Sequence, residues 1–211
     1  MTSQQNGHRP ALLPVAHPLA TVKTRSPTKQ MGNGTNGKTR HHLFSTPHTL
    51  EEKVAFLYEH QRITDLLNEY AYTLDQVMVD QSLAESHWAK LFTEDCEVTY
   101  PFGTRHGREG LAEWCCSAEL RFHRMMHLSS NFTIKFDAED ADVAYGRSSL
   151  LAVCGTDARD IAKVFQEGGY YYWSFRRVKD DADSGNGVWK ISQLFLDINW
   201  TVGDSLGLND N

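Results

Sequence analysis

The sequence predicts an α+β fold, with helices in the first half of the folded part and strands in the second. Apolar residues recur at helical spacing between residues 63 and 74, whereas from residue 132 onwards they alternate with polar residues, as in a half-buried strand. The sequence contains no strand–helix–strand alternation, no glycine-rich phosphate loop and no internal repeat. Helices and strands are therefore segregated along the chain, which favours α+β over α/β.

The first helix is the clearest single element. Thr49 followed by Glu52 has the pattern of a capping box and predicts the start of a long amphipathic helix. A second helix is expected at residues 83–92, a short strand at 97–102 and a third helix at 108–120. The apolar stripe of the first helix consists of Ile63, Leu66, Leu67, Tyr70, Ala71 and Leu74.

Four strands are expected after the helices. They cover residues 127–136, 143–154, 168–178 and 188–200, and the polar turn 179–187 joins the last two as a hairpin. The predicted architecture is a cone-shaped, curved antiparallel or mixed β-sheet, wrapped by about three N-terminal helices. Such a shape encloses a cavity, and cavities of this kind bind small molecules.

Composition excludes several classes of protein. The 211 residues suffice for one domain with a full core, and 40% of them are hydrophobic. No apolar run is long enough to span a bilayer, and the net charge of −6 argues against nucleic acid as a partner. The four cysteines show no metal-ligand spacing, so we expect no metal and reduced thiols. The expected location is cytoplasmic, with an organelle transit peptide left open.

Charge also divides the chain. Residues 1–50 hold six basic residues and no acid, and the first acidic residue is Glu51. Residues 1–48 are rich in Pro, Gly, Asn, Thr and Ser and show no apolar period, so we expect a disordered basic tail. The folded domain is expected at residues 49–203, and a flexible C-terminus at 204–211.

Three local sequences add a resemblance to this outline. They are NEYAYTLD in the first helix, CEVTYPFG in the short strand and GNGVWKISQLFLDINW in the last strand. From about residue 61 to residue 203 the chain resembles the nuclear-transport-factor-2-like cone fold, and within it the SnoaL-like polyketide cyclases and scytalone dehydratase. The resemblance implies a small-molecule substrate and no cofactor. This superfold hosts enzymes, binding proteins and adaptors alike.

Asp75 is the most informative single residue. It follows Ala71 by four positions and Leu67 by eight, so it continues the apolar stripe at a helix end where the dipole disfavours a negative charge. A carboxylate there needs a cationic partner, unless the helix has already frayed and the side chain is solvated. In the resembled family, an aspartate at the end of this helix serves a catalytic histidine.

His127 is the candidate base, since imidazole titrates near neutral pH. The resemblance places it where the dehydratase has a catalytic histidine. Strict alternation, however, puts it on the strand face opposite Phe132 and Ile134, unless a β-bulge at Ser129–Ser130 reverses the parity. A surface histidine is the alternative.

Further candidates come from the resemblance. Tyr100 corresponds to a pocket tyrosine that polarises a substrate carbonyl, with a plain core tyrosine as the alternative. Tyr171 and Trp173 are expected to bind substrate, as is Asn131, which strict alternation places on the face of His127. A second dehydratase histidine is expected near Val153 and is missing, which argues against an identical dehydration mechanism.

The sequence therefore favours a lyase, cyclase or isomerase without cofactor, acting on a polyketide-like or other polycyclic secondary metabolite. In this interpretation His127, held by Asp75, moves a proton next to a carbonyl, and Tyr100 stabilises the enolate oxygen. The rival is a non-catalytic binding or assembly module on the same fold. We also expect a homo-oligomer, a dimer or a trimer, that pairs through the open sheet face with the aromatic run 170–175.

Overall fold

The computed structural model describes residues 46–179 and 187–208. The expected tail at 1–48 lies almost entirely outside the described residues, as does most of the turn 179–187. The elements are α1 (Leu50–Gln76), η1 (Ala84–Trp88), η2 (Ala89–Leu91), β1 (Phe92–Tyr100), β2 (Gly103–His106), α2 (Leu111–Glu119), β3 (Arg124–Phe136), β4 (Val143–Gly155), β5 (Val164–Val178) and β6 (Val188–Val202).

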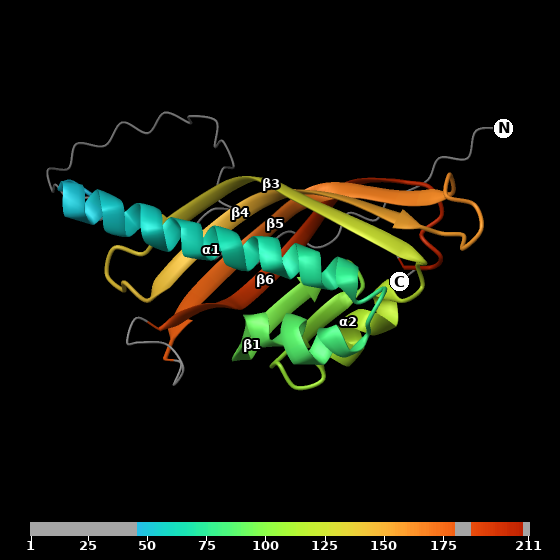
Figure 1. The fold of residues 1–211 in the computed structure, drawn as a ribbon, viewed down its shortest axis with the longest axis horizontal. Coiled ribbons are helices and arrows are strands. Elements are labelled where there is room, and N and C mark those ends of the chain that lie inside the picture. Colours follow the sequence, from blue (N-terminus) through green and yellow to red (C-terminus); the bar gives the residue numbers. More distant parts are fainter. Residues whose placement is uncertain (1–45, 180–186, 209–211) are drawn as a thin grey trace, which may run out of the picture.

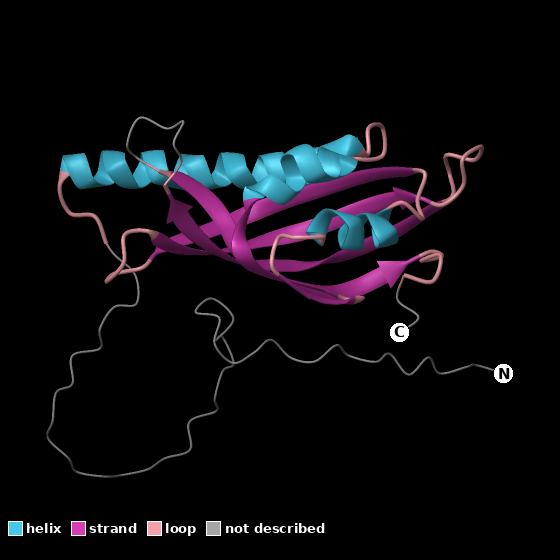
Figure 2. Cartoon of the chain, turned by 90° about the horizontal axis from the view of Figure 1, so that it is seen from below, coloured by secondary structure: helices cyan, strands magenta, loops and turns pink. Residues whose placement is uncertain are grey.

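One mixed, curved sheet forms the body of the domain (Figure 1). Its strand order is β2-β1-β6-β5-β4-β3, and it does not close into a barrel. The predicted meander from β3 to β6 is confirmed as antiparallel, whereas β1 joins β6 in parallel. The helices lie along one side of the curve, with α1 crossing the long strands (Figure 2). The α+β cone-like fold expected from the sequence is therefore confirmed.

The start of α1 follows the local sequence closely. The Thr49 hydroxyl accepts a hydrogen bond from the Glu52 backbone N–H at 3.1 Å, and the Glu52 carboxylate accepts one from the Thr49 N–H at 3.1 Å. These reciprocal bonds satisfy donors that a helix start leaves unpaired. The predicted stripe faces the sheet, and its fully buried members include Ile63, Leu67 and Tyr70.

The segment predicted as a second helix is helical, but most of it is not α-helical. The segment from Ala84 to Leu91 winds as a π-helical turn followed by a 3₁₀ turn. Its Trp88 is 1% exposed and packs against Tyr70 and Phe92. The Trp88 ring is therefore buried at the end of a π-helical turn, which is wider than the turn of an α-helix. Strands β1, β3 and β5 also begin earlier than expected, at Phe92, Arg124 and Val164.

A β-bulge divides β3 into two parts of opposite parity. Ser130 pairs with Ser149 and Thr133 with Arg147, so two residues, Asn131 and Phe132, face a single residue of β4. Asn131 has φ of 55°, a left-handed conformation that asparagine tolerates better than most residues. The bulge lies just after the expected position at Ser129–Ser130. It puts His127 on the same face as Ile134, which is the buried face.

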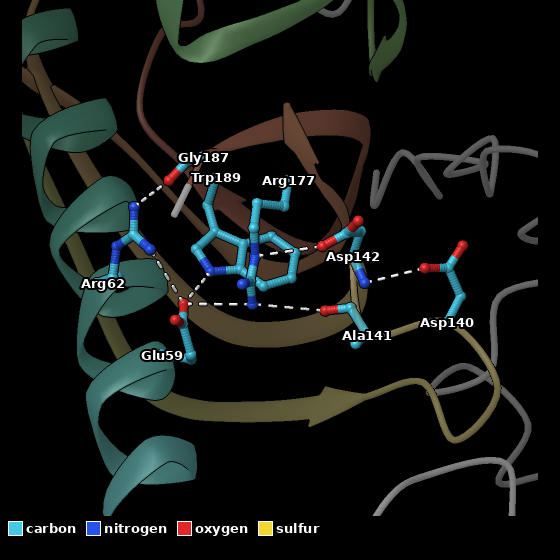
Figure 3. Close-up of polar contacts among 8 residues, drawn as sticks. All are labelled: Glu59, Arg62, Asp140, Ala141, Asp142, Arg177, Gly187 and Trp189. Carbon is cyan, nitrogen blue, oxygen red and sulfur yellow. Dashed lines mark hydrogen bonds and ion pairs between the residues drawn. The ribbon is translucent and has the colours of Figure 1, made fainter. Parts of the chain in front are cut away.

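A polar network fastens the first half of α1 to the end of the β5–β6 hairpin (Figure 3). The Glu59 carboxylate accepts a hydrogen bond from Trp189 Nε1 at 2.7 Å and pairs with Arg62 at 3.3 Å and Arg177 at 3.5 Å. The Arg177 guanidinium lies 4.7 Å from the centre of the Trp189 ring. Because the Glu59 side chain is only 18% exposed, its loss would remove a shared, partly buried acceptor from three donors, although Arg62 keeps the Gly187 carbonyl and Arg177 keeps the Ala141 carbonyl.

We expect Glu59→Ala to destabilise the domain by about 1–3 kcal/mol, since hydrogen bonds to charged groups fall in that range. Thermal unfolding followed by circular dichroism measures this change. Asn68→Ala, an exposed site on the same helix, is the control and should stay within about 0.5 kcal/mol of the wild type. Equal stability of both variants would show that the network adds nothing.

The outer face of the sheet carries an apolar patch. Cross-strand pairing aligns Met126, Val153, Gln166 and Val202 in one row, and Leu128, Leu151, Gly168 and Trp200 in the next, so that Gln166 is the one polar side chain among them. Met126, Leu128, Trp200 and Val202 are 46–61% exposed. The aromatic run expected there contributes less than predicted, because Tyr171, Trp173 and Phe175 turn inward and are buried.

We propose that this outer patch joins two or more copies of the chain, because exposed apolar patches of this kind commonly mark interfaces. Light scattering should then report a mass above the 24.0 kDa of one chain. Leu128→Glu should return the mass to that of the monomer, because a charge would be desolvated at the contact. Lys135→Glu, on the same strand, should not. A wild type of monomer mass at micromolar concentration would contradict the proposal.

Candidate active site

A small cavity lies between the inner face of the sheet and the helices. Its volume is about 10 Å³, room for about one water molecule. Leu208 closes part of it and is 6% exposed, so the expected flexible C-terminus packs on the domain as far as this residue. The lining residues are Tyr70, Leu74, Tyr100, Pro101, Phe102, Glu119, His127, Glu167, Tyr171, Leu196 and Leu208.

Asp75 and His127 meet at this cavity. The Asp75 carboxylate lies 2.7 Å from His127 Nδ1 and also accepts the His127 backbone N–H at 3.0 and 3.1 Å. Asp75 lies within α1 and its side chain is 17% exposed, while the His127 side chain is 5% exposed. The alternatives of a frayed helix end and a surface histidine are therefore wrong in this structure.

The contact sets the chemistry of the imidazole. A neutral ring that donates Nδ1–H to Asp75 keeps its lone pair on Nε2, the nitrogen left to face a ligand. Burial lowers the pKa of His127, but the hydrogen bond to Asp75 and the charges of Glu119, Asp75 and Glu167 outweigh burial and raise it above its ordinary value. The pair therefore has the geometry of a general base with an orienting carboxylate.

Three phenols form the opposite wall. The Tyr100 hydroxyl lies 2.5 Å from that of Tyr70, and Tyr70 is also hydrogen bonded to Tyr171. Burial raises the pKa of all three phenols well above its ordinary value, so they stay neutral and can act as hydrogen-bond donors. Tyr100 and Tyr171, both expected at the site, line the cavity as anticipated, and Tyr70 joins them from the apolar stripe of α1.

The remaining sequence candidates lie elsewhere. Trp173 is 1% exposed and donates Nε1–H to Ser148 at 3.1 Å, but it does not line the cavity. Asn131 forms the exposed bulge, and its side-chain amide donates to Ser149 at 3.2 Å. Near Val153, where a second histidine is missing, the residue that faces inward is Ala152. The structure does not bring Trp173 or Asn131 to His127.

Sequence reasoning missed two acidic residues of the cavity. Glu119 follows Cys115 by four positions and Ala112 by seven, so the helical period already places it on the buried face of α2. Glu167 lies before the expected start of its strand at residue 168. With β5 beginning at Val164, alternation from Tyr171 places Glu167 on the inner face.

Residues 46–179 and 187–208 contain no group of three or more His, Cys, Asp or Glu that could hold a metal ion. Within the same ranges, none of the helices has the length and apolarity needed to cross a bilayer.

Several solved structures share this architecture. A candidate scytalone dehydratase from Novosphingobium aromaticivorans is 27% identical, with a TM-score of 0.58 over 72% of this chain and 91% of that one. The hexachlorocyclohexane dehydrochlorinase LinA-type3 from Novosphingobium barchaimii is 22% identical, with a TM-score of 0.56 over 71% of this chain and 92% of that one, and shows the fold alone. No curated protein matches the chain significantly. The SnoaL-like domain model matches residues 56–194, well over half of the chain, and the chain therefore belongs to the SnoaL-like domain family.

Proposed function

We propose that the chain is a cofactor-independent lyase, cyclase or isomerase that acts on a polyketide-like or other polycyclic metabolite by acid–base chemistry. The observation that carries the proposal is the Asp75–His127 contact at the edge of a buried cavity. The Asp75 carboxylate accepts hydrogen bonds from both the ring and the backbone N–H of His127. These bonds fix the orientation and the tautomer of the imidazole, which packing contacts alone would not do.

The chemistry follows from the positions of the side chains. His127 Nε2 removes a proton from a carbon next to a carbonyl, and Asp75 stabilises the imidazolium that forms. Tyr100 or Tyr171 donates a hydrogen bond to the enolate oxygen. The imidazolium then returns the proton. If it goes to a hydroxyl leaving group, the carbon–oxygen bond breaks and water is released; if it goes to a different carbon, the product is an isomer. If the enolate carbon instead attacks a second carbonyl of the substrate, a carbon–carbon bond closes the ring and the imidazolium gives its proton to the alkoxide oxygen.

The names of the similar structures favour elimination among these outcomes. A dehydratase removes water and a dehydrochlorinase removes hydrogen chloride, and both reactions need a base for a carbon-bound proton. Because the cavity has room for about one water molecule, a substrate enters only when lining side chains such as Phe102 and Leu208 move aside. The rival function, a non-catalytic binding module, would use the same cavity without needing the Asp75–His127 pair.

Variants of the pair test the proposal on a confirmed substrate. We expect His127→Ala and Asp75→Asn each to lower turnover by roughly two to four orders of magnitude, in line with loss of a general base. The double variant should be little worse than either single one, because the two residues act as a unit. Folding should survive in Asp75→Asn, since the amide oxygen still accepts the His127 backbone N–H.

The control is His123→Ala, which removes an exposed imidazole from the turn before β3 and should leave turnover unchanged. Full turnover in Asp75→Asn would end the proposal that the carboxylate serves the base. Multiplicative losses in the double variant would assign the two residues separate roles.

The pH profile gives an independent check. His127 must be unprotonated to act as a base, and its pKa is raised, so the rise of kcat/KM on the acidic side of the profile should have its midpoint above the ordinary 6.5 of histidine. Asp75→Asn removes a hydrogen bond and a charge that raise this pKa, so its midpoint should move to lower pH. Asp95→Asn, which removes an exposed carboxylate paired with Arg176, should not move it. An unmoved midpoint in Asp75→Asn would contradict the assignment.

A further inference from the structure

A buried carboxyl faces the base across the cavity. Register pairs His127 with Ala152, and Ala152 with Glu167, so the three residues form one row across β3, β4 and β5. Residues paired directly in this way point to the same face of a sheet, and two strand spacings separate His127 from Glu167 by about 10 Å at the backbone. Ala152, the residue between them, has a small side chain, and both His127 and Glu167 line the cavity.

Glu167 has no protein partner that explains its burial. Its side chain lies on the inner face, the residue is 8% exposed, and its Oε2 is buried without a hydrogen-bond partner among the described residues. Buried polar groups are nearly always hydrogen bonded, and leaving one unpaired costs about 1–3 kcal/mol. An oxygen that lines a cavity without a partner is therefore placed to contact what enters the cavity.

The surroundings of Glu167 favour its neutral form. Burial and the charge of Glu119 raise the pKa of Glu167, His127 lowers it, and the net result is a pKa of about 7. The other charged and titratable groups around the cavity lie on several elements: Asp75 and Tyr70 on α1, Tyr100 on β1, Cys154 on β4 and Tyr171 on β5. No lysine or arginine is among the residues that line the cavity.

We propose that Glu167 is a protonated hydrogen-bond donor of this site, which binds an acceptor oxygen of an uncharged substrate and selects carbonyl or hydroxyl compounds over carboxylates. The inference rests on the proposed function for its choice of site and names the class of substrate. A carboxyl held neutral in an apolar setting donates a strong hydrogen bond, whereas its ionised form repels an acceptor oxygen. Within the described part of the chain, His127 is the one basic residue that lines the cavity, so once its imidazole is neutral the cavity offers an anion no cationic partner.

Protonation is tested on the full chain without any ligand. Carbon-13 labelled glutamate carboxyls are followed by NMR from pH 4 to pH 9 in the wild type and in Glu167→Gln. The wild type should show one carboxyl with a midpoint near pH 7 that is missing from the variant. If every resonance lost in the variant titrates with the ordinary exposed glutamates, the proposal is overturned.

Ligand selection is tested with acetophenone and benzoate, a neutral ketone and an anion of nearly the same shape. Calorimetry is done in a His127→Gln background, so that no imidazolium can pair with benzoate and no imidazole titrates. At pH 5.5 acetophenone should bind at least roughly tenfold more tightly than benzoate, and its binding should weaken roughly 5- to 10-fold at pH 8.5 as Glu167 ionises. In the same background Glu167→Gln keeps a donor but cannot ionise, so its affinity for the ketone should change far less with pH, and Glu167→Leu should bind about 5- to 10-fold more weakly than the parent at pH 5.5.

Benzoate binding as tightly as the ketone, no binding of either probe, or the same pH dependence in Glu167→Gln would each overturn the proposal. Because the readouts are protonation and binding, they are separate from turnover. Full turnover in His127→Ala would reject the proposed function while leaving a neutral Glu167 intact. Conversely, an ionised Glu167 would reject this inference while His127 still served as the base.

Discussion

The hydrogen bonds between Asp75 and His127 are the constraint on which the site depends. They join the last turn of α1 to the start of β3, two segments that lie 52 residues apart in the sequence. The bond forms only because the bulge at Asn131 returns the first half of β3 to the buried face. A carboxylate near a helix C-terminus faces an unfavourable dipole, and the donors of His127 compensate for it. The hydrogen bonds to Asp75 thus set the position of His127, select its tautomer and raise its pKa.

The rest of the cavity combines phenols and carboxyl groups with apolar side chains, and few of its groups are charged. Three phenols remain neutral because burial holds their protons in place, and Glu119 and Glu167 are shifted towards their neutral forms. These shifts also link stability to pH. A raised pKa of Glu167 means that the unfolded chain loses this proton near pH 4.5 and the folded chain only near pH 7, so stability falls across that interval. His127 acts in the same direction, because the stability it adds is lost as pH rises through its raised pKa. The groups that can exchange protons at this site therefore lower the stability of the folded domain as pH rises.

Much of the fold could be predicted because its signals are local. The capping box at Thr49, the stripe along α1 and the alternation in the late strands each depend on a few neighbouring residues. The site was harder to predict, because two features that place its residues do not follow from neighbouring residues in the sequence. The bulge that turns His127 inward depends on one left-handed residue, and Glu167 was missed because the start of β5 was placed four residues too late. The path of the η1 segment depends on the burial of Trp88 among distant aromatic rings, which no local pattern contains.

Nitrogen-15 NMR of the imidazole shows, without a substrate, whether His127 is a base held in one tautomer by Asp75. We expect the neutral ring to carry its proton on Nδ1 and to leave Nε2 unprotonated, with a titration midpoint above the ordinary 6.5 of histidine. In Asp75→Asn the midpoint should fall and the single tautomer should give way to a mixture. A neutral ring protonated on Nε2 in the wild type, or spectra that do not change in Asp75→Asn, would show that Asp75 does not orient the base.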